Sequence, residues 1–372
     1  MKKYFSLFIL IVIPVAFSLT GCRQKTRLVT GCYSETGKAG INVYDFNAAE
    51  GSLKMVLASD AGPNPSYICF SDKKKLIYAI NEVSKFGGAE GGGLTTLKYD
   101  RNFTRIKKVN ELTIPNGGPC YISITLDNRF LLIANYGGGS VTVVRLGFSG
   151  MPKKVTDFIK YDTIGEKRSH AHMISSDPQG KRIYVTDLGL DRIMIYTLNK
   201  YSGKLVPLKA EGIPLPPGTG PRHFVFNREG SEMYVNGELN STLNVLKVDD
   251  EKGLILTQSI GSLREGFQGP NYPADVHIGK SGHYLYSSNR GENTIATFKV
   301  DNNGNLTLTG NTDCGGNWPR NFVIDPSGKY LLVGNERSGS ISVFRIDGIT
   351  GAPSQVTQKV DLTSPACLKF IE

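Results

Sequence analysis

The chain of 372 residues has few of the residues that mark several common protein classes. It contains one tryptophan, five histidines and six cysteines, and no two cysteines form a C-x-x-C pair. This pattern gives neither a zinc-binding motif nor a disulfide framework. Although the net charge is +10, no dense run of Lys and Arg with interleaved aromatic residues occurs, so nucleic-acid binding is not indicated. The sequence predicts no metal and no other cofactor.

Long segments with the 3.6-residue periodicity of helices are also missing. Glycine, by contrast, is abundant with 43 residues, and 17 Phe and 17 Tyr accompany it. Glycine-containing turns between short runs of β-branched and aromatic residues are typical of strands joined by tight connections. We therefore expect an all-β protein with few helices.

Residues 1–21 are predicted to be a signal peptide. Lys2 and Lys3 precede an apolar segment, Phe5 to Phe17, that is too short for a comfortable membrane-spanning helix. The segment leads into Leu19-Thr-Gly-Cys22, which resembles the bacterial lipobox. We expect a lipidated Cys22, a short tether over 22–26, and an exported protein anchored to the periplasmic or cell-surface face of a bacterial membrane. An ordinary signal peptide with a chance cysteine is the alternative.

One unit of sequence recurs along the rest of the chain. Six segments align without gaps over seventeen residues, and a seventh begins at Pro365; successive starts are 46 to 54 residues apart. The six segments begin at Pro65, Pro119, Ala171, Pro221, Pro273 and Pro319. In each, an apolar strand, a turn and a second strand ending at Asn, Asp or Gly precede an alternating third strand, and a variable segment supplies a fourth.

Four strands per repeat at this period are typical of a β-propeller blade. Residues 27–32 and 40–46 have the pattern of second and third strands without a first, whereas residues 365–370 form a first strand without the rest. Joining them closes a ring and removes its exposed edges. The sequence thus predicts one domain over 27–372, a seven-bladed β-propeller with four antiparallel strands per blade, closed by the C-terminal strand joining the N-terminal strands.

The first repeat departs from this template after Asn81. A glycine-rich insertion over residues 85–93 precedes the next strand, and we expect it to form a flexible loop. It lacks the G-x-x-x-x-G-K-[ST] spacing, so it is not interpreted as a phosphate loop.

Two positions of the repeat vary in a way that indicates chemistry. Repeat position 2, directly after the opening residue, is occupied by Ser66, Cys120, His172, Arg222, Ala274, Arg320 and Ala366. Repeat position 18, directly after the end of the second strand, is occupied by Glu82, Tyr136, Leu188, Glu238, Arg290 and Glu336. Because propeller blades surround a central channel, we expect both positions to lie around one mouth of it. The alternatives are that Arg222 and Arg320 are inter-blade struts and that His170 is a solvated loop residue.

Imidazole, guanidinium and carboxylate groups from several blades suit addition of water to an ester or lactone, or proton abstraction next to a carboxylate. Arginine holds an anionic group or stabilises an oxyanion, and Glu or His moves a proton. No G-x-S-x-G or H-E-x-x-H motif is present, so serine-hydrolase and zincin mechanisms lack support.

Four blocks of sequence carry a resemblance to a known family. They are His170-Ala-His172 with residues 187–192, residues 220–223 with 237–242, residues 286–290, and residues 319–322. Together they resemble the bacterial lactonase family of seven-bladed propellers, which includes the propeller-type 6-phosphogluconolactonase and the fungal carboxy-muconate cyclase. The resemblance implies hydrolysis of a sugar-type lactone at the channel mouth. The implied catalytic residues are His172, Arg222, Glu238 and Arg290, and the implied substrate-binding neighbours are His170, His223 and Arg320.

The predicted export signal fits badly with a phosphorylated sugar lactone, which belongs to cytosolic metabolism. We therefore expect either a different extracytoplasmic lactone or a fold recruited for another task. The alternatives are an exported propeller that binds a ligand or a protein without catalysis, and a muconate-type cyclase or isomerase.

Overall fold

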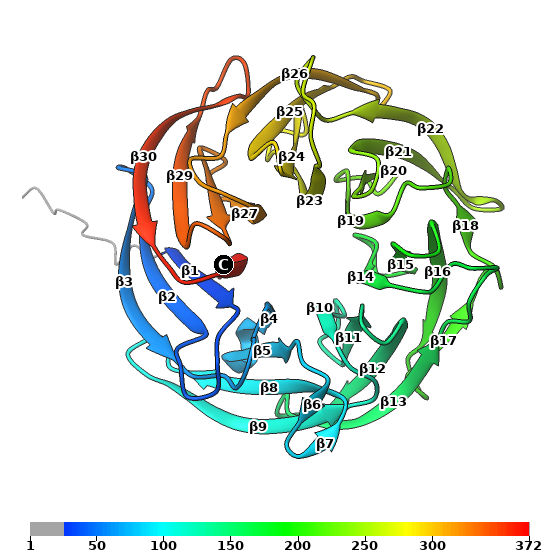
Figure 1. The fold of residues 1–372 in the computed structure, drawn as a ribbon. Helices are drawn as coiled ribbons and strands as arrows, with labels where there is room; N and C mark the ends of the chain where they lie inside the picture. Colours follow the sequence, from blue (N-terminus) through cyan, green and yellow to red (C-terminus); the bar gives the residue numbers. More distant parts are fainter. Residues whose placement is uncertain (1–25, 372) are drawn as a thin grey trace, which may run out of the picture.

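The computed structural model describes residues 26–371, which form a closed ring of seven β-sheets (Figure 1). The predicted all-β, seven-bladed propeller is confirmed, and four strands form an antiparallel path in each blade. The predicted signal peptide and Cys22 lie outside the described residues. Within 26–371 the one helix is η1, a 3-10 turn over Asp72–Lys74, and no helix is long and apolar enough to cross a membrane.

We number the blades I to VII from the first complete repeat. Blade I contains β4 (Tyr67–Ser71), β5 (Leu76–Asn81), β8 (Gly92–Tyr99) and β9 (Ile106–Ile114). Blade II contains β10 (Pro119–Ile124), β11 (Phe130–Asn135), β12 (Ser140–Leu146) and β13 (Pro152–Lys160). Blade III contains β14 (Ala171–Ser176), β15 (Ile183–Asp187), β16 (Arg192–Asn199), β17 (Lys204–Pro207) and the added β18 (Ile213–Pro214).

The remaining blades follow the same order from the channel outward. Blade IV contains β19 (Pro221–Phe226), β20 (Glu232–Gly237), β21 (Thr242–Asp249) and β22 (Gly253–Gly261). Blade V contains β23 (Tyr272–Ile278), β24 (Tyr284–Arg290), β25 (Thr294–Val300) and β26 (Leu306–Asp313). Blade VI contains β27 (Pro319–Ile324), β28 (Tyr330–Asn335), β29 (Ser340–Ile346) and β30 (Pro353–Asp361).

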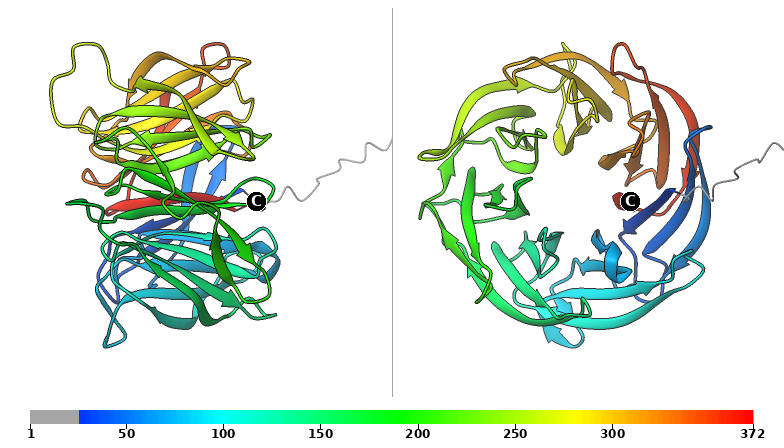
Figure 2. Two further views of the ribbon diagram at one scale, coloured as in Figure 1. Left: turned by 90° about the vertical axis from the view of Figure 1, so that its right-hand side faces the viewer. Right: turned by 180° about the vertical axis from the view of Figure 1, so that it is seen from behind.

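Blade VII joins the two ends of the described chain. Its strand order is β31 (Pro365–Ile371), β1 (Thr26–Cys32), β2 (Ile41–Asn47) and β3 (Ser52–Ser59). β1 pairs antiparallel with β31, with Leu28 opposite Phe370 and Cys32 opposite Pro365. The ring therefore closes as predicted, and β31 lies next to the channel in both face views (Figures 1 and 2).

Aromatic residues on the middle strands hold neighbouring blades together. The buried hydroxyl of Tyr78 in blade I donates to the carbonyl of Gly150 in blade II at 2.7 Å, and Tyr286 in blade V makes the same bond to Gly351 in blade VI at 2.7 Å. Both glycines lie in turns with positive φ. A Cβ at Gly351 would approach a ring carbon of Tyr284 to 2.4 Å, so glycine is needed there for close packing.

The predicted repeat is visible directly in the strand register. In blades II to VI the opening residue of the repeat pairs with its seventeenth residue, as in Pro119 with Asn135 and Pro319 with Asn335. In all five blades the register then shifts, and repeat position 2 lies within the shift. A β-bulge at a strand end re-aims the side chain it carries.

Asn or Asp residues that end the second strands of blades III and V anchor the loops that enter these blades. Asn289 donates to the carbonyl of Ser262 at 2.8 Å, and the Asp187 carboxylate accepts the N–H of His170 at 2.9 Å. Because these side chains are buried, each loop is held at a fixed distance from the mouth.

The glycine-rich insertion of blade I is a small hairpin, which corrects the expectation of a flexible loop. β6 (Lys85–Phe86) pairs with β7 (Ala89–Glu90), and Lys85 Nζ lies 2.9 Å from Glu90 Oε1. The side chain of Phe86 is buried below it. One apolar residue among the glycines thus fixes the hairpin to the blade.

Candidate active site at the channel mouth

Side chains from repeat positions 2 and 18 gather at one mouth of the channel. Position 2 lies at the start of the innermost strands, β10, β14, β19, β23, β27 and β31, and position 18 follows the end of the neighbouring strand (Figure 1). Seven short strand ends therefore bring polar groups from distant parts of the sequence into one region. They form two clusters that differ in charge.

The arginine-rich cluster consists of Arg222, Glu238 and Arg290 from blades IV and V. Glu238 Oε2 lies 2.8 Å from Arg222 Nε and 2.8 Å from Arg290 Nη2, so one carboxylate oxygen pairs with two guanidinium groups. Arg290 Nε also donates to the carbonyl of Tyr272 at 2.9 Å. Burial and, after it, the charge of Arg222 lower the pKa of Arg290 to about 9, although Glu238 opposes this shift.

Arg222 is also an inter-blade strut. Its Nη1 donates to the carbonyl of Ala274 in blade V. One part of the guanidinium thus fixes the next blade, as the strut interpretation predicts, and Nε faces Glu238. A guanidinium held in this way is pre-oriented toward negative charge.

The glutamate-rich cluster consists of Tyr33, Ser66, Glu82, Arg320 and Glu336 from blades I, VI and VII. Tyr33 accepts a hydrogen bond from Arg320 Nη2 at 2.6 Å and donates to Glu82 Oε2 at 2.8 Å. Ser66 donates to the same Glu82 oxygen at 2.6 Å, and Arg320 Nη1 lies 3.4 Å from Glu336 Oε2. Burial opposes the charge of Arg320, yet Tyr33 and these carboxylates raise its pKa. Arg320 thus pairs with Glu336 directly and is linked to Glu82 through the Tyr33 hydroxyl.

His172, at position 2 of blade III, lies near Tyr136 and His223. Its side chain is 5 % exposed, and its Nδ1 is buried and unpaired within the described part of the chain. The ring centroid lies 5.6 Å from that of Tyr136 and 5.2 Å from that of His223. Burial lowers the pKa of His172 well below its usual value, and the nearby Arg222 adds to the effect. The imidazole is therefore neutral near pH 7.

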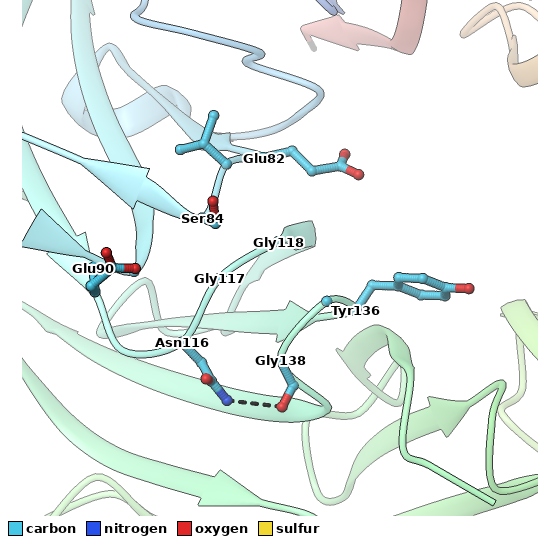
Figure 3. A pocket seen from close by; sticks show the side chains of 11 residues that line it. Glu82, Ser84, Glu90, Asn116, Gly117, Gly118, Tyr136 and Gly138 are labelled. Atoms are coloured by element: carbon cyan, nitrogen blue, oxygen red, sulfur yellow. Dashed lines mark hydrogen bonds between the residues drawn. The ribbon is translucent and has the colours of Figure 1, made fainter.

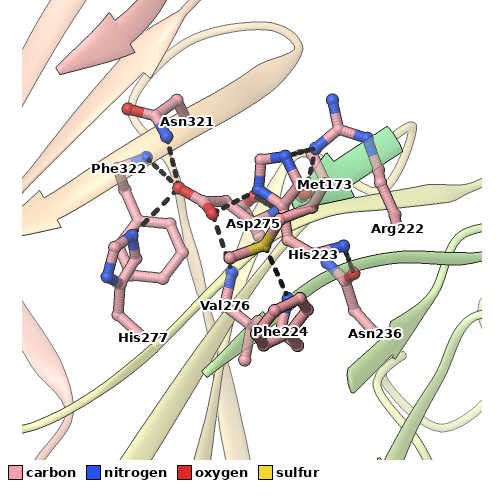
Figure 4. A network of polar contacts seen from close by, with 12 residues as sticks. Met173, Arg222, His223, Phe224, Asn236, Asp275, Val276, His277, Asn321 and Phe322 are labelled. Atoms are coloured by element: carbon pink, nitrogen blue, oxygen red, sulfur yellow. Dashed lines mark hydrogen bonds and ion pairs between the residues drawn. The ribbon is translucent and has the colours of Figure 1, made fainter. Parts of the chain in front are cut away.

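A buried network supports Arg222 from within the channel (Figure 4). His223 Nδ1 lies 2.7 Å from Asp275 Oδ1, and its Nε2 lies 3.4 Å from Arg222 Nη1. Asp275 Oδ2 also contacts His277 Nε2 at 3.0 Å and the amide of Asn321. Burial lowers the pKa of His223 to about 4, so its Nδ1–H donates to Asp275 and its neutral Nε2 faces Arg222.

His170 takes a different role from His172. It lies on the loop before β14, where its ring stacks on Tyr136 with centroids 4.5 Å apart and its Nδ1 lies 3.1 Å from the carbonyl of Tyr136. His170 is therefore held by Tyr136 on the loop, whereas His172 lies near Tyr136 and His223. Among residues 26–371 no group of three or more His, Cys, Asp and Glu side chains is arranged to hold a metal ion.

Two residues of the mouth were missed from the sequence. Cys32 pairs with Pro365, so Tyr33 is position 18 of blade VII. This relation could have been found by aligning the split repeat across both chain ends. Trp318 has a φ of 66° and lies between two guanidinium groups, with Arg290 5.4 Å and Arg337 3.2 Å from its ring centroid. The only tryptophan, placed directly before a repeat, was the available signal.

Comparison with known proteins assigns the chain to a family. The family model for the lactonase 7-bladed β-propeller matches residues 27–370. The structure is similar to the periplasmic gluconolactonase of Pseudomonas aeruginosa, with a TM-score of 0.86 and 28% identity over 93% of this chain and 99% of that one. It is equally similar to a putative 6-phosphogluconolactonase of Bacteroides fragilis, with a TM-score of 0.86 and 30% identity over 95% and 99% of the two chains.

A curated relative covers nearly the same span. The 6-phosphogluconolactonase of Bacillus subtilis is 28% identical over 349 residues, which is 92% of this chain and 97% of that protein. Both the family model and the relatives thus include every blade that contributes to the mouth. The chain belongs to the lactonase family of seven-bladed β-propellers.

Proposed function

We propose that the protein hydrolyses a sugar-type lactone at the mouth formed by the two clusters. The observation that carries this proposal is Glu238 Oε2, held 2.8 Å from both Arg222 and Arg290, beside the unpaired Nδ1 of His172. A region with fixed positive charge and a free base fits the two needs of ester hydrolysis. The names of the Pseudomonas and Bacillus relatives support a lactone as the substrate class.

In the proposed reaction, the carbonyl oxygen of the lactone faces Arg222 and Arg290. A water molecule adds to the carbonyl carbon, and the guanidinium groups stabilise the negative charge that develops on the oxygen. The carbon–oxygen bond of the ring then breaks, and the ring oxygen leaves as a hydroxyl group after taking up a proton. The product is the open hydroxy acid.

His172 is the stronger candidate for the base that takes the proton from water. Its imidazole is neutral and its Nδ1 has no partner in the described structure, whereas Glu238 Oε2 is already paired with two guanidinium groups. Glu238 then serves mainly to hold the two arginines in place. A neutral imidazole can take a proton from water as a general base, and its lowered pKa makes the imidazolium that forms ready to pass the proton on to the leaving oxygen.

The test is release of acid from gluconolactone above the spontaneous rate, compared among variants. We expect Arg222→Ala and His172→Gln each to lower kcat/KM by at least about 100-fold, as for loss of an oxyanion donor or base. The matched control is Arg264→Ala, which removes a half-exposed arginine paired with Asp313 outside the mouth. Equal turnover in all of these proteins, with unchanged thermal unfolding, would sink the assignment. Binding of sugar acids without turnover would instead favour a binding propeller.

We infer further that the protein is exported and anchored through Cys22. The Leu19-Thr-Gly-Cys22 motif supports this location, as does the periplasmic gluconolactonase among the similar structures. The expected result is incorporation of labelled fatty acid and recovery in the membrane fraction, both lost in Cys22→Ser. Recovery of the unsubstituted protein in the cytosolic fraction would contradict the inference.

A further inference from the structure

A second cavity adjoins the mouth on the side of the glutamate-rich cluster. It has a volume of about 570 Å³ and lies between loops of blades I and II (Figure 3). Glu82 and Tyr136 line both this pocket and the mouth, and in Figure 3 their side chains extend in the same direction. The volume falls within the range of about 300–1,000 Å³ that is usual for small-molecule sites.

The walls of the pocket are built largely from backbone. Five glycines line it, namely Gly91, Gly117, Gly118, Gly137 and Gly138. A Cβ at Gly138 would lie 2.5 Å from the Asn116 side chain, and one at Gly117 would lie 2.9 Å from the Cα of Ser84. The loops are joined by hydrogen bonds, including Gly118 N–H to the carbonyl of Val83 at 2.9 Å and the Asn116 amide to the carbonyl of Gly138 at 2.8 Å. The pocket is therefore preformed.

Its polar groups are acceptors and hydroxyls without cations. Glu82 and Glu90 contribute carboxylates, and no Lys or Arg is among the lining residues, although Glu90 is paired at 2.9 Å with Lys85, which lies outside the lining. Among residues 26–371, Glu82 is therefore the lining carboxylate that has no cation in direct contact. The hydroxyls of Ser84 and Tyr136 make no hydrogen bond to the part of the chain that the structure describes. Such a surface repels a phosphate group and offers partners to a ligand with many neutral hydroxyls.

Within the described chain, the arginines near the pocket offer no unpaired positive charge to a phosphate group. Arg320 is paired with Glu336 and bonded to Tyr33, and Arg222 and Arg290 share Glu238. The exposed Arg337 stacks on Trp318 next to blade VI, whereas the pocket lies between blades I and II. A phosphate placed in the pocket would thus meet carboxylates before it met a free guanidinium group.

We propose that this pocket binds a neutral, polyhydroxylated substituent of the substrate, such as a second sugar unit, while the lactone ring lies at the mouth. The proposal rests on the proposed lactonase function and names its substrate class. Tyr136 lies where the two parts of such a substrate would join, because its ring stacks on His170 and also lies 5.6 Å from that of His172.

The test compares three probes with the full chain: gluconolactone, the disaccharide lactone cellobionolactone, and phosphorylated gluconolactone. We expect kcat/KM for cellobionolactone to exceed that for either other probe by about tenfold or more, as for one good binding contact. Ser84→Trp, which places an indole in the pocket, should lower the value for cellobionolactone at least about fivefold more than the value for gluconolactone. The control, Ser281→Trp, changes an exposed turn at the opposite end of the strands and should alter neither value.

A second readout separates this proposal from the lactonase assignment. Cellobionate, the open acid, should raise the unfolding temperature of the wild-type protein but not of Ser84→Trp. Equal turnover of mono- and disaccharide lactones, or preference for the phosphorylated probe, would overturn the pocket proposal while leaving the lactonase assignment intact. Stabilisation by cellobionate without hydrolysis of any lactone would overturn the assignment and support the pocket.

Discussion

The two clusters at the mouth use the same repeat positions but have opposite charge. In blades IV and VI, an arginine at position 2 pairs with a glutamate sixteen residues later, Arg222 with Glu238 and Arg320 with Glu336. The difference in charge between the two clusters comes from the blade that follows each of these pairs. Blade V adds a second arginine, Arg290, whereas Tyr33 of blade VII connects Arg320 to another glutamate in blade I.

This difference shows how a symmetric fold becomes an asymmetric site. On one side two guanidinium groups share one carboxylate. On the other side one guanidinium pairs with one carboxylate directly and reaches a second through the hydroxyl of Tyr33. The first side suits a developing oxyanion, and the second suits hydroxyl groups. A substrate would therefore bind in one orientation across the channel, although each blade is built from the same template.

The largest contrast is expected when matching glutamates of the two clusters are neutralised. Glu238→Gln leaves two neighbouring guanidiniums without their shared carboxylate, so we expect a loss of lactone turnover of at least about 100-fold and of about 3 kcal/mol in unfolding free energy. Glu336→Gln should lower turnover by less than about tenfold. Steady-state kinetics and urea unfolding measure both. Equal losses in the two variants would show that the clusters are functionally equivalent.

Acid should destabilise the folded protein through His172 and His223, which lie next to the arginine-rich cluster. The folded-state pKa values of His172 and His223 are lowered, the latter to about 4, so between about pH 6.5 and pH 4 the unfolded chain binds protons that the folded chain does not. This contribution to stability is complete above about pH 6.5 and falls by roughly 1.4 kcal/mol per pH unit for each imidazole as the pH is lowered. Urea unfolding at several pH values measures the slope.

Histidine variants test whether His172 contributes to the dependence of the unfolding free energy on pH. His172→Gln should flatten the dependence of unfolding free energy on pH, because one of the two proton-binding differences is removed. His283→Gln, which changes an exposed histidine on a turn, should keep the wild-type slope. An unaltered slope in His172→Gln would place the acid sensitivity elsewhere.

The network behind Arg222 should affect activity through the orientation of His223. Asp275→Asn removes the carboxylate that fixes the tautomer of His223, so Nε2 no longer reliably faces Arg222. We expect kcat to fall about tenfold, with a changed pH profile and a smaller change in KM. His277→Asn removes the other imidazole bonded to Asp275, farther along β23, and should retain most of the activity. A similar loss in both variants would indicate a general packing defect.

Charge on the acidic side should set tolerance for phosphate. Glu82→Gln removes one carboxylate shared by the mouth and the pocket, so the ratio of kcat/KM for phosphorylated to unphosphorylated gluconolactone should rise roughly threefold. Glu111→Gln, which changes an exposed glutamate paired with Lys108, serves as the control. A constant ratio at low ionic strength would refute an electrostatic role for Glu82.

The smallest effect is expected at the residue that joins blades VI and I. Tyr33→Phe loses the hydrogen bonds to Arg320 and Glu82, and we expect a loss of about 1–2 kcal/mol in unfolding free energy with about twofold lower turnover. Tyr201→Phe, at a side chain that is 93% exposed, should match the wild type. If the unfolding curves of the two variants superimpose, the hydrogen bonds of Tyr33 do not contribute to the unfolding free energy.

The ring could be predicted from the sequence because its repeat is almost free of gaps. The spacing from Pro119 to Asn135 is also a strand pairing, so counting residues was enough to locate two positions around the mouth. Apolar alternation and turn residues recur with the same period, and closure through residues 365–370 followed from the missing strand.

The contacts inside the mouth depended on geometry that no local pattern encodes. Register shifts at position 2 turn the side chain of Arg222 toward Glu238, and they are a property of backbone pairing. Tyr33 escaped notice because its blade is split between the chain ends. The hairpin of the insertion was missed because burial of the single Phe86 outweighs the glycines around it.

The pairing of β31 with β1 also orders events during protein synthesis. Tyr33 is held in part by its N–H, which donates to the carbonyl of Ser364 at 3.1 Å, and Cys32 lies opposite Pro365. A ribosome makes Tyr33 early and residues 364–371 more than three hundred residues later. A nascent chain therefore lacks a complete mouth until these last residues emerge, and proteolytic loss of them would open the ring and the site in a single cut.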